Sequence, residues 1–450
     1  MLIKSKRGSY FVFVTMVFAA MIIFVFALIY AAGAKAIDST ADNLGRLWGR
    51  SILAEYDLKL QQRYGLFAFY GNDYDTGEKL EQYAEYSFSS KKYIEMGPVS
   101  ASLEKYNICQ ADIFRKQIKD IVASANDPIQ INIDDNETQS GQCKSNANSG
   151  KSPRYDLSDV PVIKSQRIIK SLPSKGKEGG VNILSLVEKL KEGISISDIT
   201  TEASDNIYIF KYYKDYLNDR NLGDTFFENE VEYIISGKLD DEKARKSVKT
   251  DILLIRNGLN LAYLYTSPEK RQITLAAAEL ITPGFMAYAT QGLIMEVWAA
   301  FEASNDMKIL YAGKPVPILK KDENWAISLE NVLRDKFGID LNREMDDEEV
   351  EEYLDDVKNG TEDILQGEDD EDEDVDYIKP EKFEGLEYGN YLRILVAALP
   401  QKARMLRMQD LIQINMKYLY CEYFLLADYF TGVDYEFKVN GRKHAFSESY

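Results

Sequence analysis

The chain has 450 residues, of which 45% are hydrophobic, and it carries a net charge of −19. This length and this hydrophobic content allow two or three domains with cores, and they exclude a disordered chain. The acidic balance argues against nucleic acid as a partner, because phosphate binding requires clustered Lys and Arg, and no basic stripe occurs beyond the first residues.

The first predicted element is an uncharged apolar run at residues 10–33, which is long enough to cross a lipid bilayer as one helix. The leader that precedes it, residues 1–9, is basic. The positive-inside rule therefore predicts a cytoplasmic N-terminus, with the bulk of the chain on the outer face of the cell membrane. A cleaved secretory signal peptide is the alternative, and Ala32-Gly33-Ala34 would be its cleavage site.

Residues 34–70 are predicted to continue the helix as an amphipathic stem. Gly45 and Gly49 weaken a helix by up to about 1 kcal/mol each relative to Ala, so neighbouring structure must support them. A membrane helix that continues as an amphipathic stem is the layout of a pilin. The alternative is a stalk that packs on its own outer domain. The stem is predicted from apolar residues at spacings of three and four: Ile37, Ala41, Leu44, Trp48 and Ile52.

Residues 71–170 are predicted to form a small α+β unit with a helix near Val122. An insert at 127–154 is rich in Asn, Ser, Gly and Asp, and it cannot bury enough apolar surface to offset its ordering entropy. We therefore expect this insert to be exposed. The segment 171–182 has the composition of a second linker.

The three cysteines form no recognisable redox or metal motif, since none of them is spaced as Cys-x-x-Cys. Cys109 and Cys143 bracket the start of the polar insert, so they form either one disulfide or two separate thiols. Cys421 lies in an apolar run and is predicted to belong to the core.

Residues 183–345 are predicted to form a helical outer domain. Asp240 to Tyr265 has one continuous apolar face, and Ser267-Pro268 provides a capping residue and a first-turn proline for the next helix. That helix is expected to end near Ile281, and a third covers Met286 to Ser304. Three consecutive helices with wide apolar faces predict a bundle.

The segment 346–384 is acidic, and charges this dense are predicted to stay solvated. Val375 stands where an EF-hand loop needs glycine, and Pro380 lies where the following helix should already be running. A solvated linker is therefore the preferred interpretation. The alternative is a calcium site whose carboxylates are spaced as in an EF-hand: Asp370, Asp372, Asp374 and Glu381.

Residues 385–450 are predicted to form further helices and then a closing hairpin around Asn440-Gly441. The predicted fold class is therefore α+β, mostly α. Its parts are a single N-terminal transmembrane helix that continues as a stem, a small α+β unit, a helix-bundle ectodomain and a C-terminal β-hairpin.

The candidates for chemistry are few. His444 is the only histidine, and we expect it to be a solvent-exposed strand residue. No nucleophile elbow, zinc motif or paired-cysteine motif occurs, so no catalytic residue, cofactor or metal ligand is predicted. Arg256 and Asn260 lie one helical turn apart and are predicted to form a buried polar pair. Hydrolysis by carboxylates alone is an alternative, because it needs only two Asp or Glu about 5 to 10 Å apart across a cleft.

The basic leader carries a resemblance to prepilins. Lys6-Arg7-Gly8-Ser9 resembles a prepilin leader, in which a short basic segment ends in Gly and a peptidase cuts after it. The resemblance implies processing between Gly8 and Ser9, with Ser9 as the first mature residue. Phe13 stands where pilin-like proteins usually carry Glu, so the chain departs from the pilin pattern at that position.

Six further motifs extend the resemblance over most of the chain. Together with the leader, they resemble an uncharacterised family of Gram-positive membrane proteins related to the TadE and TadG minor pilins of tight-adherence (Flp) pili. That family provides no catalytic residue to carry over. The motifs are Arg50-Ser51-Ile52-Leu53-Ala54-Glu55-Tyr56, Tyr64-Gly65-Leu66-Phe67, Glu230-Val231-Glu232-Tyr233-Ile234, Leu254-Ile255-Arg256-Asn257-Gly258-Leu259-Asn260, Gly313-Lys314-Pro315-Val316-Pro317 and Arg407-Met408-Gln409-Asp410-Leu411-Ile412.

The resemblance implies a non-enzymatic, pilin-like accessory or assembly protein of a tight-adherence pilus system, with the lipid bilayer and other pilin-like or pilus-assembly proteins as partners. Ala19-Ala20 and Ala31 to Ala34 are candidate contact points within the anchor, because helices associate in lipid through small residues. Two alternatives stay open. One is a stand-alone cell-surface scaffold without a pilus role, and the other is a carboxylate-dependent envelope hydrolase.

Overall fold

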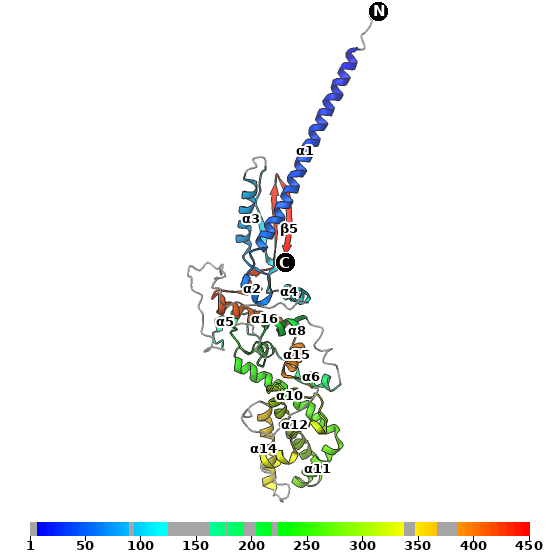
Figure 1. Cartoon of the computed structure of the whole chain (residues 1–450), viewed down its shortest axis with the longest axis vertical. Coiled ribbons are helices and arrows are strands. Elements are labelled where there is room, and N and C mark those ends of the chain that lie inside the picture. Colours follow the sequence, from blue (N-terminus) through cyan, green and yellow to red (C-terminus); the bar gives the residue numbers. More distant parts are fainter. Residues whose placement is uncertain are drawn as a thin grey trace, which may run out of the picture. The chain divides into compact units, whose positions relative to one another are not determined.

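The computed structural model describes residues 7–89, 94–124, 162–176, 179–192, 204–217, 224–336, 347–366 and 385–450. The fold is α+β and mostly helical, as predicted, with one long apolar N-terminal helix, small antiparallel sheets and a C-terminal hairpin (Figure 1). The chain divides into two compact units. The helix–sheet unit comprises Met1–Gln61, Phe67–Ile113 and Ala427–Tyr450, and the helical unit comprises Gln62–Leu66 and Phe114–Leu426.

The helix–sheet unit is built from both ends of the chain. Its long helices are α1 (Arg7–Leu53) and α3 (Asp73–Phe88), with a short turn η1 (Glu104–Tyr106). The strands β2 (Ser100–Ser102), β4 (Gly432–Val439) and β5 (Arg442–Ser449) form an antiparallel sheet in that order. A separate antiparallel pair joins β1 (Phe69–Tyr70) to β3 (Tyr429–Phe430). Side chains from α1, α3 and β4 form the core, including Trp48, Leu80 and Phe437.

Helix α1 runs without a break from the apolar segment into the stem, as predicted, but it ends at Leu53 rather than near residue 70. The chain turns there, and Asp57 starts a new helix because its carboxylate accepts the backbone N–H of Leu60 at 2.9 Å. The new helix is α2 (Leu58–Tyr64). Helices α2 and α4 (Ala111–Ser124) contribute residues to both units.

The predicted C-terminal hairpin is confirmed, and its strands are longer than expected. Asn440 and Gly441 connect β4 to β5, with φ angles of 49° and 79°. A two-residue type I′ turn requires positive φ at both central positions, and Asn-Gly satisfies this requirement at little steric cost. The turn therefore sets the register in which Phe437 lies opposite His444.

The helical unit contains most of the helices. Its longer ones pack side by side around a core that includes Trp298, Trp325 and Val357. The described helices are α5 (Gln166–Ser171), α6 (Ile183–Lys191), α8 (Ser204–Tyr212), α9 (Glu230–Ser236), α10 (Asp241–Thr266), α11 (Pro268–Ile281), α12 (Ala287–Tyr311), α13 (Leu329–Asn331), α14 (Asp347–Leu365), α15 (Tyr388–Ala398) and α16 (Gln401–Asn415), with short 3₁₀ turns η3 (Gly284–Met286) and η4 (Asp322–Asn324) and short π-helical segments η5 (Val332–Lys336) and η6 (Met416–Tyr420). The short turn η7 (Leu426–Asp428) contributes residues to both units.

The three consecutive helices of the predicted bundle are α10, α11 and α12. Asp240 caps α10 by accepting the N–H of Lys243 at 3.0 Å. Ser267 caps α11, and Pro268 is its first residue, as the sequence predicts. Helix α12 is longer than expected and ends at Tyr311.

Two segments predicted to be linkers, the acidic one also to be solvated, are folded where the structure describes them. Residues 347–365 form α14, because apolar residues recur at helical spacing among the carboxylates, and Val357 and Ile364 are buried. In the segment 171–182, Leu172 and Ser174 are buried. The polar insert at 127–154 and the candidate calcium loop at 370–381 lie outside the described residues.

The cysteines differ in state. Cys109 carries a thiol, so the alternative in which it bridges to Cys143 is not observed. Cys421 is buried, as predicted, and it is disulfide-bonded. Cys143 lies outside the described residues.

Candidate functional site

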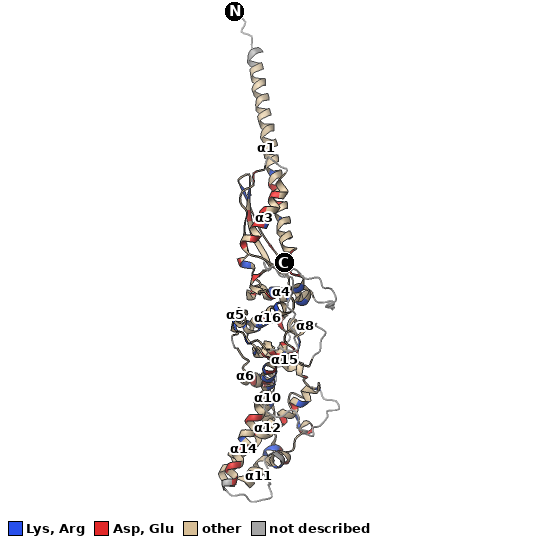
Figure 2. Cartoon of the chain, turned by 90° about the vertical axis from the view of Figure 1, so that its left-hand side faces the viewer, with Lys and Arg blue, Asp and Glu red and all other residues tan. Residues whose placement is uncertain are grey.

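The first half of α1 exposes a continuous apolar surface. Its large apolar side chains between Tyr10 and Tyr30 are 41–80% exposed, although burial of each would contribute about 1.5–3 kcal/mol. In Figure 2 this half of the helix is tan, the colour of residues other than Lys, Arg, Asp and Glu. Within the described part of the chain, α1 is the one helix that is long and apolar enough to cross a membrane. Its length and composition are therefore consistent with a single-pass membrane anchor.

The stem half of α1 packs closely on the sheet of its own unit. Trp48 is buried, and the hydroxyl of Tyr435 on β4 donates to the carbonyl oxygen of Gly45 at 2.7 Å. A Cβ atom at position 45 would lie 2.6 Å from the ring of Phe446, and one at Gly49 would lie 2.5 Å from the hydroxyl of Tyr435. At both glycines that weaken the stem helix, the sheet thus lies too close to leave room for a larger side chain.

Two polar contacts join the stem to β5. Asp38 forms an ion pair with Arg442, and Asp42 lies 2.7 Å from Nδ1 of His444. His444 is only 8% exposed, and its ring stacks on Phe437. The prediction that His444 is solvent-exposed is therefore wrong, because the strand register places it on the side of β5 that contacts α1.

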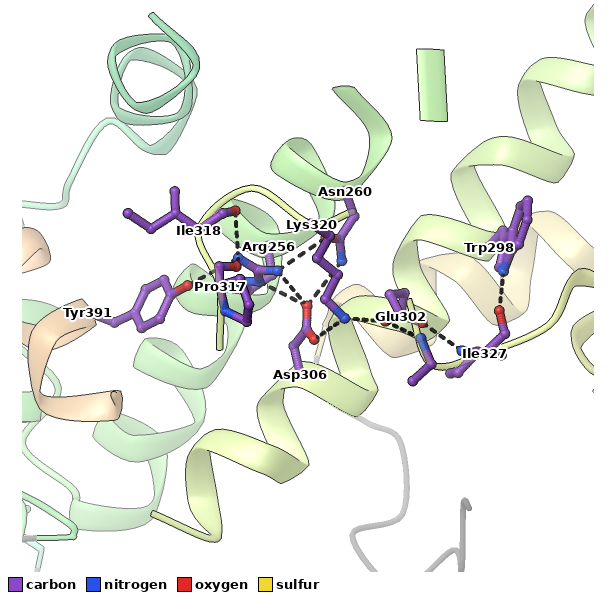
Figure 3. Close-up of polar contacts among 11 residues, drawn as sticks. Arg256, Asn260, Trp298, Glu302, Asp306, Pro317, Ile318, Lys320, Ile327 and Tyr391 are labelled. Atoms are coloured by element: carbon purple, nitrogen blue, oxygen red, sulfur yellow. Dashed lines mark hydrogen bonds and ion pairs between the residues drawn. The ribbon is translucent and has the colours of Figure 1, made fainter. Parts of the chain in front are cut away.

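A cluster of charged side chains is buried in the helical unit between α10, α12 and the segment 314–327 (Figure 3). The Nε and Nη2 atoms of Arg256 lie 2.9 and 2.8 Å from one carboxylate oxygen of Asp306. The other oxygen of Asp306 lies 2.5 Å from Nζ of Lys320, which also pairs with Glu302. Asn260 donates to Asp306 at 3.2 Å and accepts from Arg256 at 3.2 Å. The predicted buried pair of Arg256 and Asn260 is confirmed as part of this charge cluster.

The charge cluster holds a connecting segment against the helices. Nη1 of Arg256 donates to the carbonyl oxygens of Pro317 and Ile318 at 2.9 and 3.0 Å. The carboxylate of Glu302 accepts the backbone N–H of Ile327 at 2.9 Å, and the carbonyl of Ile327 accepts from Trp298 at 2.8 Å. The segment has little regular structure of its own, so these bonds satisfy backbone groups that would otherwise be buried without partners.

The electrostatics of the charge cluster are balanced, with two cations and two carboxylates. Burial raises the pKa of Glu302, although the neighbouring Lys320 opposes that shift. Burial alone would lower the pKa of Arg256, but Asp306 and Tyr391 outweigh it and raise the pKa. Arg256 and Glu302 have 0% exposure. Since groups that act on a substrate must reach it, this geometry favours a structural role.

Glu302, Asp306 and Lys320 were not singled out from the sequence. A usable signal was present for the two carboxylates, because they lie one turn apart on the side of α12 that also carries Met295, Ala299 and Ile309. Charges on the buried face of an apolar helix need partners, so such a pair indicates a cation from another segment. The sequence contains no comparable signal for Lys320, because this residue lies in a connecting segment.

A second buried network joins α9 to α16. The hydroxyl of Tyr233 donates to Asp410 at 2.7 Å, and the other oxygen of Asp410 accepts the N–H of Ser174 at 2.9 Å. Arg407 donates to the carbonyls of α9 at its C-terminal end, including Ile235 at 2.7 Å. Four of the six sequence motifs therefore fold into two buried networks: the motifs at 230–234 and 407–412 join in one, and the motifs at 254–260 and 313–317 join in the other.

Glu232, also in α9, is a buried carboxyl group that is only partly hydrogen-bonded. One carboxylate oxygen accepts from the Tyr388 hydroxyl at 2.8 Å and from the N–H of Tyr216 at 3.1 Å, but the other oxygen is buried without a hydrogen bond. Burial raises the pKa of Glu232 to about 7. This carboxyl group therefore holds a proton into the neutral range.

A shallow pocket of about 360 Å³ lies on the three-stranded sheet, and Asp434 and Glu436 line it. Burial alone would raise the pKa of Asp434, but hydrogen bonds from Tyr106, Ser447 and Lys105 outweigh it and lower the pKa. A glycosidase needs one carboxyl that stays protonated to donate its proton. Asp434 has the opposite property, so it cannot be that acid, although an ionised carboxylate is the second group that a glycosidase uses.

The other predicted site residues lie in α1. Gly8 and Ser9 belong to its first turn, and Ala19-Ala20 lies on its exposed apolar half. Among the residues that the structure describes, no group of three or more His, Cys, Asp or Glu could hold a metal ion.

Comparison with known proteins identifies a family but no activity. No curated protein and no solved structure matches the chain. A family of unknown function, DUF5702, matches residues 157–441, which is more than half of the chain and includes both buried networks. The chain therefore belongs to the DUF5702 family.

Proposed function

We propose that this protein is a non-enzymatic, pilin-like accessory or assembly protein of a tight-adherence pilus system. The observation that carries the proposal is α1, in which an exposed apolar half continues directly into a stem that packs on an antiparallel sheet. Pilin-like subunits have this layout of a membrane helix and an amphipathic stem. The helical unit then presents an outer surface for other pilus components.

The leader supports the same proposal. Gly8 ends a short basic segment immediately before the apolar run, where a prepilin peptidase would cut. The anchor would then begin at Ser9. Phe13 provides no carboxylate, so the contact that pilins make through Glu at this position is not part of the proposal.

The test is the N-terminus of the protein extracted from its native membrane, measured by intact mass and N-terminal sequencing. We expect the wild-type chain to begin at Ser9 and a Gly8→Val variant to begin at Met1. The matched control is Gly33→Val, which alters the competing signal-peptide site; because a Cβ at Gly33 meets nothing within 4 Å, this helix should tolerate it. The control should still begin at Ser9.

Two outcomes contradict the proposal. A wild-type chain that begins at Met1 favours the stand-alone surface scaffold, whose anchor is only a tether. A wild-type chain that begins near Lys35, with cleavage blocked by Gly33→Val, would show that the apolar run is a signal peptide.

A further inference from the structure

The Asn440–Gly441 turn of the C-terminal hairpin lies at the end of the helix–sheet unit from which the apolar half of α1 emerges (Figure 1). The stem and β5 run in the same direction, because successive contacts advance along both of them. In order along α1, these contacts are Asp38 with Arg442, Asp42 with His444, Gly45 with Phe446 and Gly49 with Glu448. The turn precedes Arg442, so it lies on the anchor side of the first contact.

Tyr30 marks the level at which α1 leaves the hydrocarbon of a bilayer. Tyr10 and Tyr30 are both exposed, and they lie twenty residues apart, which is about 30 Å along the helix and equals the thickness of the hydrocarbon core. Tyr is also typical of the two membrane–water interfaces. The headgroup layer therefore extends about 5–8 Å beyond Tyr30.

The hairpin turn lies next to this headgroup layer. Asp38 follows Tyr30 by eight residues, or about 12 Å along the helix. Its partner Arg442 directly follows the turn, and one strand residue spans about 3.3 Å, so the turn lies about 9 Å beyond Tyr30. The long side chains of exposed Lys and Arg residues span the remaining distance to the lipid phosphates.

Cations are concentrated at this end of the unit, which we call the basic tip. Lys35 and Lys438 are exposed, and neither forms an ion pair within the part of the chain that the structure describes. Lys443 pairs with Glu436, which lies deeper in the hairpin. The basic tip is therefore positive in a chain whose net charge is −19. Its charged residues are four cations and two carboxylates: Lys35, Lys438, Arg442, Lys443, Asp38 and Glu95.

We infer that the basic tip binds the headgroups of anionic lipids in the same bilayer that holds α1. The inference rests on the membrane anchor of the proposed function. Clustered Lys and Arg beside a membrane span attract anionic lipids. Interfacial Lys and Arg also fix the tilt and rotation of a membrane helix. The basic tip is thus a second attachment point, which sets the angle at which the stem leaves the membrane.

The composition of the hairpin favours lipid headgroups over a protein partner. The whole hairpin lies within the described residues, and all of its large apolar side chains except Phe446 are buried, while Phe446 is half-buried. Protein interfaces depend on apolar and aromatic anchors at their centres. A small polar surface with unpaired cations offers no such anchor, but it matches a layer of lipid phosphates.

Hydrogen exchange of the full chain in lipid nanodiscs tests the inference. Nanodiscs of phosphatidylcholine alone are compared with nanodiscs that also contain phosphatidylglycerol, on peptides that span the turn. Each Lys or Arg beside an anionic surface contributes about fivefold to binding. Exchange in these peptides should therefore be at least about fivefold slower when phosphatidylglycerol is present. The double variant Lys35→Gln with Lys438→Gln should lose most of this difference, and it should fold normally because both side chains are exposed.

The matched control removes two cations from the same unit, by Arg50→Gln with Lys105→Gln. Arg50 follows the contact of Gly49 with Glu448, and Lys105 pairs with Asp434, so both lie toward the far end of the hairpin. This control should retain the lipid effect. Equal exchange in both kinds of nanodisc, or a lipid effect that the first double variant retains, would overturn the inference but leave the anchor intact. A chain that does not enter nanodiscs would overturn both.

Discussion

In the helix–sheet unit, ion pairs lie at the surface, as in Lys443 with Glu436, whose side chains are 57% and 49% exposed. In the helical unit, Arg256 and Asp306 pair at 0% exposure, and Arg404 pairs with Asp205 at 7% and 1%. Burying ions is costly, and hydrogen bonds must satisfy them completely to offset the cost. The helical unit therefore depends on specific polar partners, whereas the helix–sheet unit depends on shape and apolar packing.

This difference separates structural residues from candidate contact surfaces. The motifs of the helical unit contain Arg256, Tyr233 and Asp410, and all three are buried in hydrogen-bonded networks. The exposed apolar surfaces lie elsewhere, on the first half of α1 and at side chains such as Leu280 and Phe285. The motifs that contain these residues thus indicate how the chain folds rather than what it binds.

The largest expected effect comes from breaking the charge cluster. Asp306→Ala leaves Arg256 and Lys320 buried without their shared carboxylate, so we expect it to lower the free energy of unfolding of the helical unit by about 3–5 kcal/mol. Hydrogen exchange measured by mass spectrometry would report this on peptides from α10 and α12. The control, Glu330→Ala, breaks an exposed pair with Arg334 and should cost less than about 0.5 kcal/mol. Equal effects of the two variants would contradict the comparison of the units.

The second prediction uses the pKa of Glu232, which burial raises from 4.5 to about 7. The folded state therefore holds the proton more tightly than the unfolded state, and this contribution to stability is complete below about pH 4.5 and lost as pH rises to about 7. Glu232→Gln removes the titration, so its advantage over wild type should grow across that window to about 2–3 kcal/mol above pH 7.

Urea unfolding at several pH values measures this advantage. Glu188→Gln in α6 is the matched control, because Glu188 is an exposed carboxylate of the same unit, and its removal should change the free energy of unfolding by less than about 0.5 kcal/mol. An advantage of Glu232→Gln that is the same at pH 4.5 and pH 8 would show that burial does not shift this carboxyl group.

The sequence predicts most of the helices and the hairpin because their signals are local. Hydrophobic spacing, the caps of α10 and α11 and the Asn-Gly turn each depend on a few adjacent residues. The pairing of β2 with the C-terminal hairpin in one sheet is not predictable in this way. The register of β2 against β4 pairs Ser102 with Asp434, more than 300 residues apart, and no local pattern specifies such a pairing.

The polar contacts also divide into those that local spacing predicts and those that it does not. Arg256 and Asn260 are one turn apart on one helix, so their pairing follows from spacing. Lys320 joins them from a connecting segment, and the burial of His444 depends on the strand register and on α1. The prediction of a solvated linker at α14 is wrong for a different reason. It rested on the acidic residues, but their apolar neighbours, including Val357, occupy the buried side of a helix.

The smallest predicted effect tests whether shape decides the stability of the helix–sheet unit. Gly45→Ala gains up to about 1 kcal/mol of helix propensity, but its Cβ would lie 2.6 Å from the ring of Phe446, and overpacking of this kind costs about 1–3 kcal/mol. We expect a net loss of about 1–2 kcal/mol, measured by hydrogen exchange on peptides from the stem and β5. Gly33→Ala meets no neighbour and should be neutral or slightly stabilising. If both variants stabilise the unit, the stem does not rely on close contact with the sheet. Close packing would then not be what distinguishes the helix–sheet unit from the helical unit with its buried polar partners.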